Sequence, residues 1–387
     1  MKNKLIIAAL LLVVFVAGCG SKSNLGDQGA NDESQMETNA EDENPEEQVE
    51  KEEDKDNAKE SDKTDKEEEK DSEYTIDDFF AADSDVEYIY EGDGGEFSSY
   101  KEYIDFFNDN RKQVREVNGG TEVVYVIEKT ETELKKIYEM AEVYYKENFL
   151  SKDPNINKTI LKSPIVVGTK WDNKEYGKSE ITAIDTEVET GFGTLKAVEV
   201  TTLNTLDGKE TVLKEYFAKN VGLVKSVYKD DLYEVNVILN EINENKIFKS
   251  TLNFYYPNGN ADRIFLYKKE LDFKTNDIPR KLIEELYKEY PNDVGPVLTK
   301  NSKINHLYLN NDGRAYIDLS KEFVNEMNAG SGVEAMILQS LANTVGDYFG
   351  VSKVMLTIEN EPYESGHILL EKFEAIEVNY DGIVDKN

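Results

Sequence analysis

The sequence predicts an α+β protein in three parts. These are a disordered acidic tether, an antiparallel β-meander domain that is curved or closed into a half-barrel, and a two-layer α+β domain. Three observations favour this division. Residues 21–73 contain no aromatic side chain and many acidic ones. Short strand patterns separated by turn signals fill residues 83–245. Hairpin patterns then alternate with helical periodicities over residues 249–378.

The amino terminus has the pattern of a bacterial secretion signal. Two lysines precede the apolar run Leu5–Ala17, which is too short to span a bilayer comfortably. The run closes in Val16–Cys19, whose order (Val, Ala, Gly, Cys) resembles the lipobox of bacterial lipoproteins. This resemblance implies that residues 1–18 are removed and that the thiol of Cys19 receives a diacylglycerol.

Lipidation of Cys19 predicts a protein anchored to the extracytoplasmic face of the cell membrane. Two or more acyl chains make a stable anchor, whereas one chain binds reversibly. The alternative is a plain signal peptide with an incidental cysteine, and it is disfavoured because the one cysteine of the chain falls at the cleavage point. Once Cys19 is lipidated, no thiol remains for a disulfide, a metal site or a nucleophile.

The predicted tether covers residues 19–75. Within residues 21–73, 22 acidic residues stand against seven lysines, a net charge of −15 out of the chain's −34. Such a segment buries too little apolar surface to offset its conformational entropy, so we expect it to be disordered. A flexible chain of this length spans about 40 Å, and like-charge repulsion extends it. The strongly negative charge also argues against nucleic acid as a partner.

Residues 83–245 are predicted to be β-rich. Val86–Glu91 alternates apolar and polar residues, and Ile184–Val200 forms a hairpin pattern. Thr132–Tyr145 has apolar residues at helical spacing, which predicts a helix while leaving a strand open. Further strands are expected at Glu122–Val126, Leu213–Ala218, Val221–Lys225 and Tyr233–Leu239. The interior of such a meander is expected to be filled by side chains, with a lipid- or peptide-binding interior as the alternative.

Residues 249–378 open with a hairpin and a helix. The strand patterns Ser250–Tyr256 and Ile264–Tyr267 flank an Asn-Gly turn signal. A helix is predicted over Ile278–Tyr290, with Asn276 as its N-cap, because apolar residues line one face and a proline stands in the first turn.

A second hairpin and a long helix complete this part. The hairpin arms are Ile304–Leu309 and Ala315–Asp318, and Ser331–Glu334 is predicted to be a capping box that opens the helix. Gly350 is expected to end the helix in a left-handed conformation, and Val354–Glu359 is the last strand. The expected architecture is a sandwich of two or three helices on one antiparallel sheet.

The order and the residues of these elements resemble the GerMN domain of sporulation and spore-germination lipoproteins. The stretches that carry the resemblance are Asn253–Pro257, Ile278–Tyr290, Gly313–Phe323, Glu334–Thr344 and Lys353–Glu359. The resemblance implies binding rather than chemistry, because GerMN domains are similar to the ring-building folds of sporulation proteins and no catalytic residue carries over. Family members often hold two copies, whereas this chain shows one, so a role that needs a tandem pair is not expected.

Candidate catalytic residues are few. His306 and His367 share no motif and are not at metal-ligand spacing, so structural roles are expected for both. Asp318 and Glu359 are candidates for carboxylate chemistry, but 79 acidic residues make such pairs inevitable by chance. The chain has no nucleophile elbow and no phosphate loop. We therefore expect no catalytic site, no metal and no cofactor.

The leading hypothesis is a non-enzymatic, lipid-anchored envelope protein that acts as a scaffold in sporulation or spore germination. Its expected partners are envelope or sporulation proteins, with peptidoglycan as a further candidate, bound through the GerMN-like domain. Two alternatives stay open. One is a peptidoglycan hydrolase that uses Asp318 or Glu359, and the other is a carrier that holds a lipid or peptide in the β-rich domain.

Overall fold

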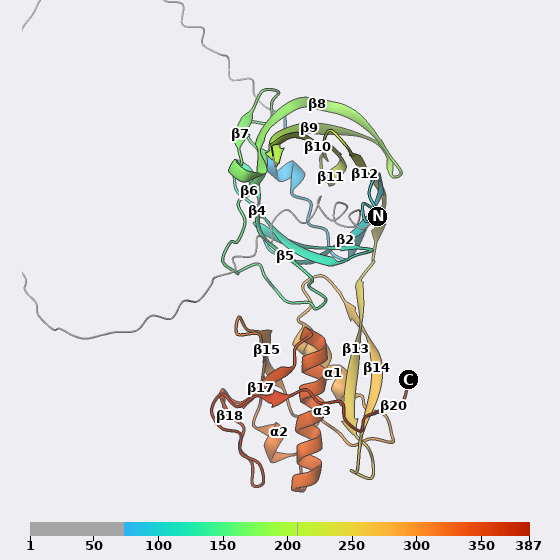
Figure 1. Ribbon diagram of the computed structural model, residues 1–387, viewed down its shortest axis with the longest axis vertical. Helices are drawn as coiled ribbons and strands as arrows, with labels where there is room; N and C mark the ends of the chain where they lie inside the picture. The colour runs from blue at the N-terminus through green and yellow to red at the C-terminus, as the bar shows by residue number, and fades with distance from the viewer. Residues whose placement is uncertain (1–72, 207) are drawn as a thin grey trace, which may run out of the picture. The chain divides into compact units, whose positions relative to one another are not determined.

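The structure is a computed structural model that describes residues 73–206 and 208–387 (Figure 1). The predicted signal peptide, Cys19 and nearly all of the predicted tether lie outside the described residues. The described residues form a strongly curved sheet, called the barrel below, and a C-terminal module that begins at Phe248. No helix among the described residues is both long and apolar enough to cross a membrane.

The barrel is a sheet of twelve antiparallel strands. Its strands are β1 (Val86–Asp93), β2 (Tyr100–Phe107), β3 (Arg111–Asn118), β4 (Glu122–Lys129), β5 (Glu133–Ala141), β6 (Lys158–Lys162), β7 (Lys170–Asp172), β8 (Lys178–Thr190), β9 (Gly193–Leu206), β10 (Lys209–Ala218), β11 (Gly222–Lys229) and β12 (Glu234–Glu244). The chain meanders through β1 to β6 and through β7 to β12, and β1 pairs with β12. The predicted antiparallel meander is confirmed.

Side chains close the seam between the two edge strands, β6 and β7. Asn173 follows β7, and its side-chain amide accepts from the backbone N–H of Thr159 at 2.8 Å and donates to the same residue's carbonyl at 2.9 Å. The Nε1 of Trp171 donates to that carbonyl as well, at 3.0 Å. These contacts satisfy edge groups that would otherwise stay open, so the sheet curls into a nearly closed barrel rather than a half-barrel.

The helix predicted over Thr132–Tyr145 is wrong, because this segment contains strand β5. Leu134 packs inside the barrel, whereas Ile137 packs against the core outside it. The register with β4 shifts between Val126 and Ile127, which makes Ile137 an extra residue in the strand. The three-residue spacing of Leu134 and Ile137 therefore comes from a bulge in a strand that is buried on both faces, not from a helix.

A short 3₁₀ turn, η2 (Ile76–Phe79), lies within the ring of strands in Figure 1. Ile76 and Phe79 are buried there among apolar residues of β5, β6, β8, β9 and β10. The backbone N–H of Asn220 donates to the carbonyl of Asp78 at 2.7 Å, which holds η2 at the end of the barrel where β10 turns into β11. This end of the interior is filled by side chains, as expected.

The C-terminal module contains two small sheets, not the single antiparallel sheet that was predicted. One sheet holds β13 (Phe248–Pro257), β14 (Ile264–Phe273) and β20 (Val384–Asp385). The other holds β15 (Ile304–Leu309), β16 (Ala315–Leu319), β17 (Lys353–Ile358), β18 (Glu361–Pro362) and β19 (Ile376–Glu377). β16 and β17 are parallel, because the long helix between them returns the chain to the same end of the sheet.

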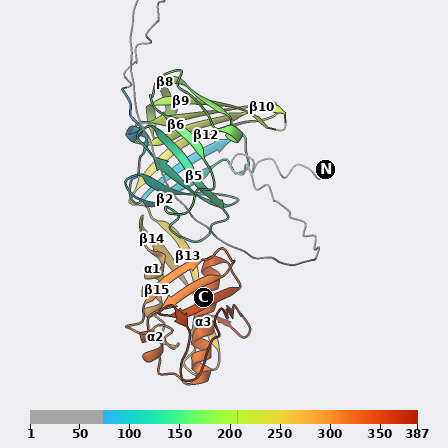
Figure 2. The same ribbon diagram turned by 90° about the vertical axis from the view of Figure 1, so that its left-hand side faces the viewer.

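Three helices accompany these sheets. They are α1 (Pro279–Lys288), α2 (Glu322–Asn325) and α3 (Ser331–Phe349), and α3 packs against strands of both sheets (Figure 2). The predicted hairpins, the helix after the first hairpin and the left-handed Gly350 after α3 are confirmed.

Two predicted helix caps are wrong. Asn276 is not the N-cap of α1; it has a φ of 65°, and its Oδ1 accepts from the backbone N–H of Phe107 at 3.0 Å. The Ser331–Glu334 capping box does not form. Glu334 turns into the core instead, where its carboxylate accepts from Tyr363 at 2.8 Å. In both places a distant partner outcompetes the local hydrogen bond.

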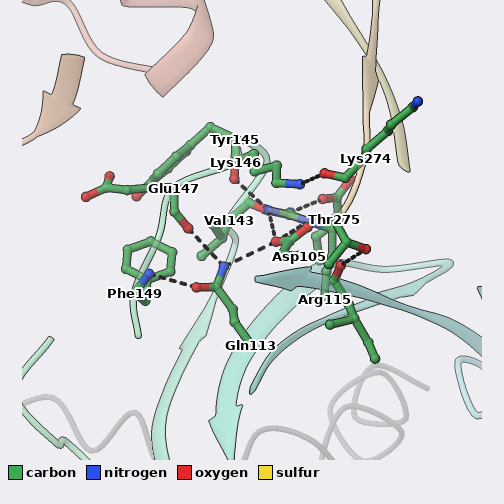
Figure 3. Close-up of polar contacts among 12 residues, drawn as sticks. Asp105, Gln113, Arg115, Val143, Tyr145, Lys146, Glu147, Phe149, Lys274 and Thr275 are labelled. Carbon is green, nitrogen blue, oxygen red and sulfur yellow. Dashed lines mark hydrogen bonds and ion pairs between the residues drawn. The ribbon is translucent and has the colours of Figure 1, made fainter. Parts of the chain in front are cut away.

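A buried polar network joins the outer face of the barrel to the C-terminal module (Figure 3). Arg115 on β3 donates to the carbonyls of Val143 and Tyr145, and its guanidinium lies 4.6 Å from the ring centroid of Phe248. The backbone N–H of Lys146 donates to the hydroxyl of Tyr348 on α3 at 3.1 Å. One apolar core also runs from β2, β4 and β5 into the module. The module is therefore fixed to the barrel wall by buried contacts.

Candidate functional site

A groove of about 530 Å³ in the C-terminal module is the strongest candidate site, and it is called the α1–β15 groove below. It is lined by Arg280, Lys281, Glu284, Glu285, Lys303, Ile304, Asn305, His306, Asp318, Glu359 and Asn360. The pairing of β15 with β16 and of β16 with β17 brings His306, Asp318 and Glu359 to this one place. Three of the four residues considered for chemistry from the sequence thus meet in space.

Asp318 is committed to structure. It is only 4% exposed, and its Oδ1 accepts from the hydroxyl of Thr357 and from the backbone N–H of Asn360, both at 2.6 Å. Its Oδ2 accepts from the side-chain amide of Asn305 at 3.0 Å. Both carboxylate oxygens are therefore occupied by donors from three segments. A carboxylate held in this way fixes the turn after β17.

Glu359 and His306 present exposed side chains to the groove. Glu359 has a φ of 51° and Asn360 a φ of 69°, so the turn after β17 is left-handed at two non-glycine residues. The Oε1 of Glu359 accepts from the backbone N–H of Lys321 at 3.2 Å, which orients this side chain. Backbone strain of this kind persists only where surrounding contacts impose it, and here Asp318 supplies them.

Arg280 and Glu284 are two of the α1 side chains that line the groove. Arg280 donates to the carbonyl of Ile304 at 2.8 Å, and Glu284 accepts from the N–H of the same residue at 2.8 Å. Lys288 pairs with Glu284 at 2.6 Å. Because α1 caps the first residue of the edge strand β15, the helix and the strand form one rigid wall.

The groove carries both signs of charge. Lys281 and Lys303 lie on its lining together with Glu285 and Glu359. Such a surface suits a partner with complementary charges of both signs and does not suit an apolar ligand. Sequence reasoning missed the α1 residues, although the polar face of the amphipathic helix was a visible signal.

The remaining predicted residues lie elsewhere. His367 is exposed and is not among the residues that line the groove; its backbone N–H donates to the Oγ of Ser365 at 3.0 Å. No three histidine or acidic side chains among the described residues are placed to hold a metal ion. Cys19, the predicted lipidation site, lies outside the described residues.

A second, smaller pocket of about 460 Å³ lies beside the turn between β15 and β16. Arg314 pairs with Asp312 at 2.7 Å, and the exposed ring of Phe373 forms part of the lining. Desolvation raises the pKa of Asp312, but its hydrogen bonds with Arg314 and Tyr316 outweigh this and lower the pKa to about 2. Asp312 is thus held by Arg314 and Tyr316, and the other acid of the lining, Glu377, lies 3.7 Å from the Nζ of Lys353.

The comparison with protein families finds a match within the C-terminal module. Residues 253–364 match the family model of the Germane domain, described as "Sporulation and spore germination". No curated protein matches the chain.

Several solved structures are similar to this chain. The first GerMN domain of the sporulation protein GerM from Bacillus subtilis is 20% identical, with 33% of this chain and 97% of that chain covered and a TM-score of 0.27. The tandem GerMN domains of the same protein give 20% identity, 33% and 46% coverage and a TM-score of 0.28, so this chain spans about half of that pair. A protein from Bacteroides fragilis with a YmcC-like fold gives 9% identity, 43% and 99% coverage and a TM-score of 0.31.

The match lies where the sequence resemblance was found. It includes the second half of β13, α1, the β15–β16 hairpin, α3 and β17, and so it contains the whole α1–β15 groove. Residues 253–364 match the Germane domain of sporulation and spore germination, and this segment is called the Germane domain below.

Proposed function

We propose that this chain is a non-enzymatic, lipid-anchored protein of the cell envelope that binds a partner through its Germane domain during sporulation or spore germination. The observation that carries the proposal is the match of residues 253–364 to the Germane family. The lipobox pattern that ends in Cys19 supports the anchor, and the acidic segment after it supplies the reach from the membrane.

The α1–β15 groove is the proposed contact surface. It is preformed, because Arg280 and Glu284 are fixed to the backbone of Ile304 before any partner arrives. Preformed walls reduce the entropy that binding has to offset. Its mixed charge favours a protein segment with charges of both signs, and peptidoglycan is the second candidate because its peptides also carry both signs.

Cross-linking in intact sporulating cells tests this proposal. The wild-type chain with a C-terminal tag is compared with Lys281→Glu/Lys303→Glu, which reverses two charges of the groove. We expect one defined envelope protein to be recovered with the wild type and to be depleted at least tenfold with the double variant. The matched control is Lys196→Glu/Lys209→Glu, two exposed barrel lysines, which changes net charge equally and leaves recovery intact.

Two results would count against this function. Equal recovery by the groove variant and the control variant would exclude the groove as the contact surface. Recovery of no envelope partner at all, in sporulating and vegetative cells, would overturn the scaffold itself.

The hydrolase alternative has one observation in its favour, the meeting of His306, Asp318 and Glu359 in the groove. Release of muropeptides from purified peptidoglycan, lost in Glu359→Gln, would establish it. We expect no release, because Asp318 is saturated with hydrogen-bond donors. Native mass spectrometry of the whole chain tests the carrier alternative, which requires a co-purified lipid or peptide.

A further inference from the structure

The two ends of the barrel interior differ in polarity. In an antiparallel meander, alternate turns lie at the same end of the sheet. η2 closes the end that carries the turns after β4 and β10, since Asp77 pairs with Lys129 and the carbonyl of Asp78 accepts from Asn220. The turns after β1, β3 and β11 lie at the opposite end. The strands near these turns send polar side chains inward.

Glu102 and Glu116 are the centre of this polar end. They stand directly opposite each other on β2 and β3, where neighbouring Cβ atoms are about 5 Å apart. Glu102 also stands opposite Tyr88, which packs in the interior core. The hydroxyl of Tyr125 donates to Oε1 of Glu102 at 2.6 Å. Two carboxyl groups thus share one interior location beside tyrosine rings.

Charges on distant strands meet across this interior. Burial lowers the pKa of Lys136 on β5, but Glu139, Glu116 and Glu215 outweigh it, so that the pKa is raised. β5 and β10 are far apart in the order of the sheet, and Glu215 stands opposite the interior residue Val200 on β9. The interaction between Lys136 and Glu215 is explained if both side chains point into the barrel interior from opposite sides.

The polar cluster has an excess of carboxyl groups. Its charged members are Glu102, Glu116, Glu139, Glu215, Lys112 and Lys136. Lys136 is already engaged with Glu139 at 2.7 Å and lies 4.2 Å from the ring centroid of Tyr125. Lys112 donates to the carbonyl of Ala81. Both lysines therefore already have a partner, and the charge of Lys136 offsets only part of the effect that burial and Glu102 have on Glu116.

One carboxyl oxygen of Glu116 is buried without a partner, although the side chain also has a hydrogen bond with Asn118. The residue is only 5% exposed, and its Oε1 has no hydrogen-bond partner among the described residues. Burial, then the charge of Glu102, raise the pKa of Glu116 to about 8, and burial also raises the pKa of Glu102. An unpaired buried carboxyl oxygen is rare in proteins and calls for an explanation.

Several members of the cluster keep some exposed surface. Tyr100, Glu102, Lys136 and Glu215 are each half-buried. Glu116 lies two residues before Asn118, the last residue of β3, and so it is near the end of the barrel opposite η2.

We propose that the polar end of the barrel interior binds a primary ammonium group, held by the carboxylates of Glu116 and Glu102 beside the rings of Tyr100 and Tyr125. An ammonium offers three N–H donors, and it matches two carboxylates and tyrosine faces. Calcium and magnesium are disfavoured, because they prefer six or more oxygen ligands and no group of three histidine, cysteine or acidic residues among the described residues could hold a metal ion. The occupant is an unbranched alkylamine, either free or as the side chain of a lysine.

Binding is linked to proton release. Without ligand, Glu116 is protonated at pH 7. When the ammonium group binds, the carboxyl group of Glu116 ionises to a carboxylate and its proton is released to solvent. Affinity therefore rises as pH approaches 8. It falls again above about pH 10, where the amine itself loses its charge.

Isothermal titration calorimetry on the whole chain in non-ionic detergent tests the site, with n-butylammonium as the probe at pH 7.5. We expect saturable one-to-one binding, at least tenfold weaker binding for Glu116→Gln, and none for Glu102→Gln/Glu116→Gln. Titrations in two buffers of different ionisation enthalpy should show protons released. The control is Glu187→Gln, an exposed residue of β8.

The outcomes separate clearly. Absence of saturable wild-type binding at millimolar probe, or equal affinity for Glu116→Gln and Glu187→Gln, would overturn the site. Tetramethylammonium binding as tightly as n-butylammonium would overturn the primary-amine assignment, because this probe has no donor. Nα-acetyl-lysine amide, tested beside n-butylammonium, shows whether a peptide side chain or only a free amine fits. Circular dichroism shows that the glutamine variants are folded.

Discussion

Arg115 and Asp105 form an ion pair, Nη2 to Oδ2 at 3.0 Å, in which neither side chain is exposed to solvent. The second oxygen of Asp105, Oδ1, has no hydrogen-bond partner among the described residues. Arg115 also pairs with Glu122 at 2.6 Å. The pair lies on the barrel strands that face the Germane domain, so its loss should weaken both parts of the molecule.

Arg115→Met should destabilise the protein by about 3–5 kcal/mol, because it leaves a buried carboxylate without its counter-charge. Urea unfolding, followed by circular dichroism, measures the change. Lys101→Met is the control; it removes the ion pair with Glu87, but Lys101 is half exposed and the loss should stay below about 1 kcal/mol. Similar losses for both variants would show that burial does not decide the energy of this pair.

Glu116 should make stability depend on pH. Its pKa is raised in the folded state to about 8, so the folded protein binds a proton that the unfolded chain releases above its ordinary value of 4.5. Stability from this group is fully present below about pH 4.5 and is lost as pH rises through 8. Glu116→Gln should therefore melt at least roughly 2–4 °C above the wild type at pH 9, about 1 kcal/mol.

The same comparison at pH 4, below the pKa of the unfolded chain, is the internal control for Glu116. There the wild type already carries the proton, so the two melting temperatures should agree. A constant difference between the variants at both pH values would mean that Glu116 is ionised throughout.

Asn173→Ala should open the seam of the barrel. The substitution removes both hydrogen bonds that the side chain makes to the backbone of Thr159. We therefore expect the backbone amide of Thr159 to exchange with deuterium about 10–100-fold faster, which corresponds to a loss of roughly 1–3 kcal/mol of local stability. Hydrogen exchange read by mass spectrometry reports this. Asn204→Ala, which removes an exposed bond to the carbonyl of Glu175, should leave the exchange of Thr159 unchanged.

Tyr363→Phe should destabilise the Germane domain by about 1–3 kcal/mol, because it removes a donor from the buried carboxylate of Glu334. Thermal unfolding measures it. Tyr267→Phe is the matched control, since its partner Asp293 is exposed, and a change below about 0.5 kcal/mol is expected. An effect of equal size in both would assign the loss to the ring environment rather than to Glu334.

Regular alternation and turn chemistry predicted most of the fold. Val86–Glu91 and Ile184–Val200 were recognisable because one face of each strand is apolar. β2 and β3 were missed, since Tyr100–Phe107 and Arg111–Asn118 carry charged residues on both faces. Several of those charges, among them Asp105, Arg115 and Glu116, are buried inside the barrel or against the Germane domain, where no sequence pattern marks a strand.

The candidate site was predicted only in fragments. His306, Asp318 and Glu359 were each considered, but their meeting in one groove depends on the register of β15, β16 and β17. Arg280 and Glu284 were seen only as the polar face of a helix. The ammonium site was not predicted, because Glu102 and Glu116 meet through strand pairing and Glu215 through curvature of the sheet.

The sequence by itself determined the local features of this protein: its turns, most of its strands, its helices and the stretches that carry the Germane resemblance. Each of these features depends on residues that are neighbours in the sequence, so the sequence is enough to predict it. Only the tertiary structure decided that Asn173 closes the barrel, that Glu334 leaves its helix end for Tyr363, and that Arg115 is buried beside Phe248. Each of these contacts joins residues far apart in the chain, and burial gives them an energy that exceeds the local alternatives.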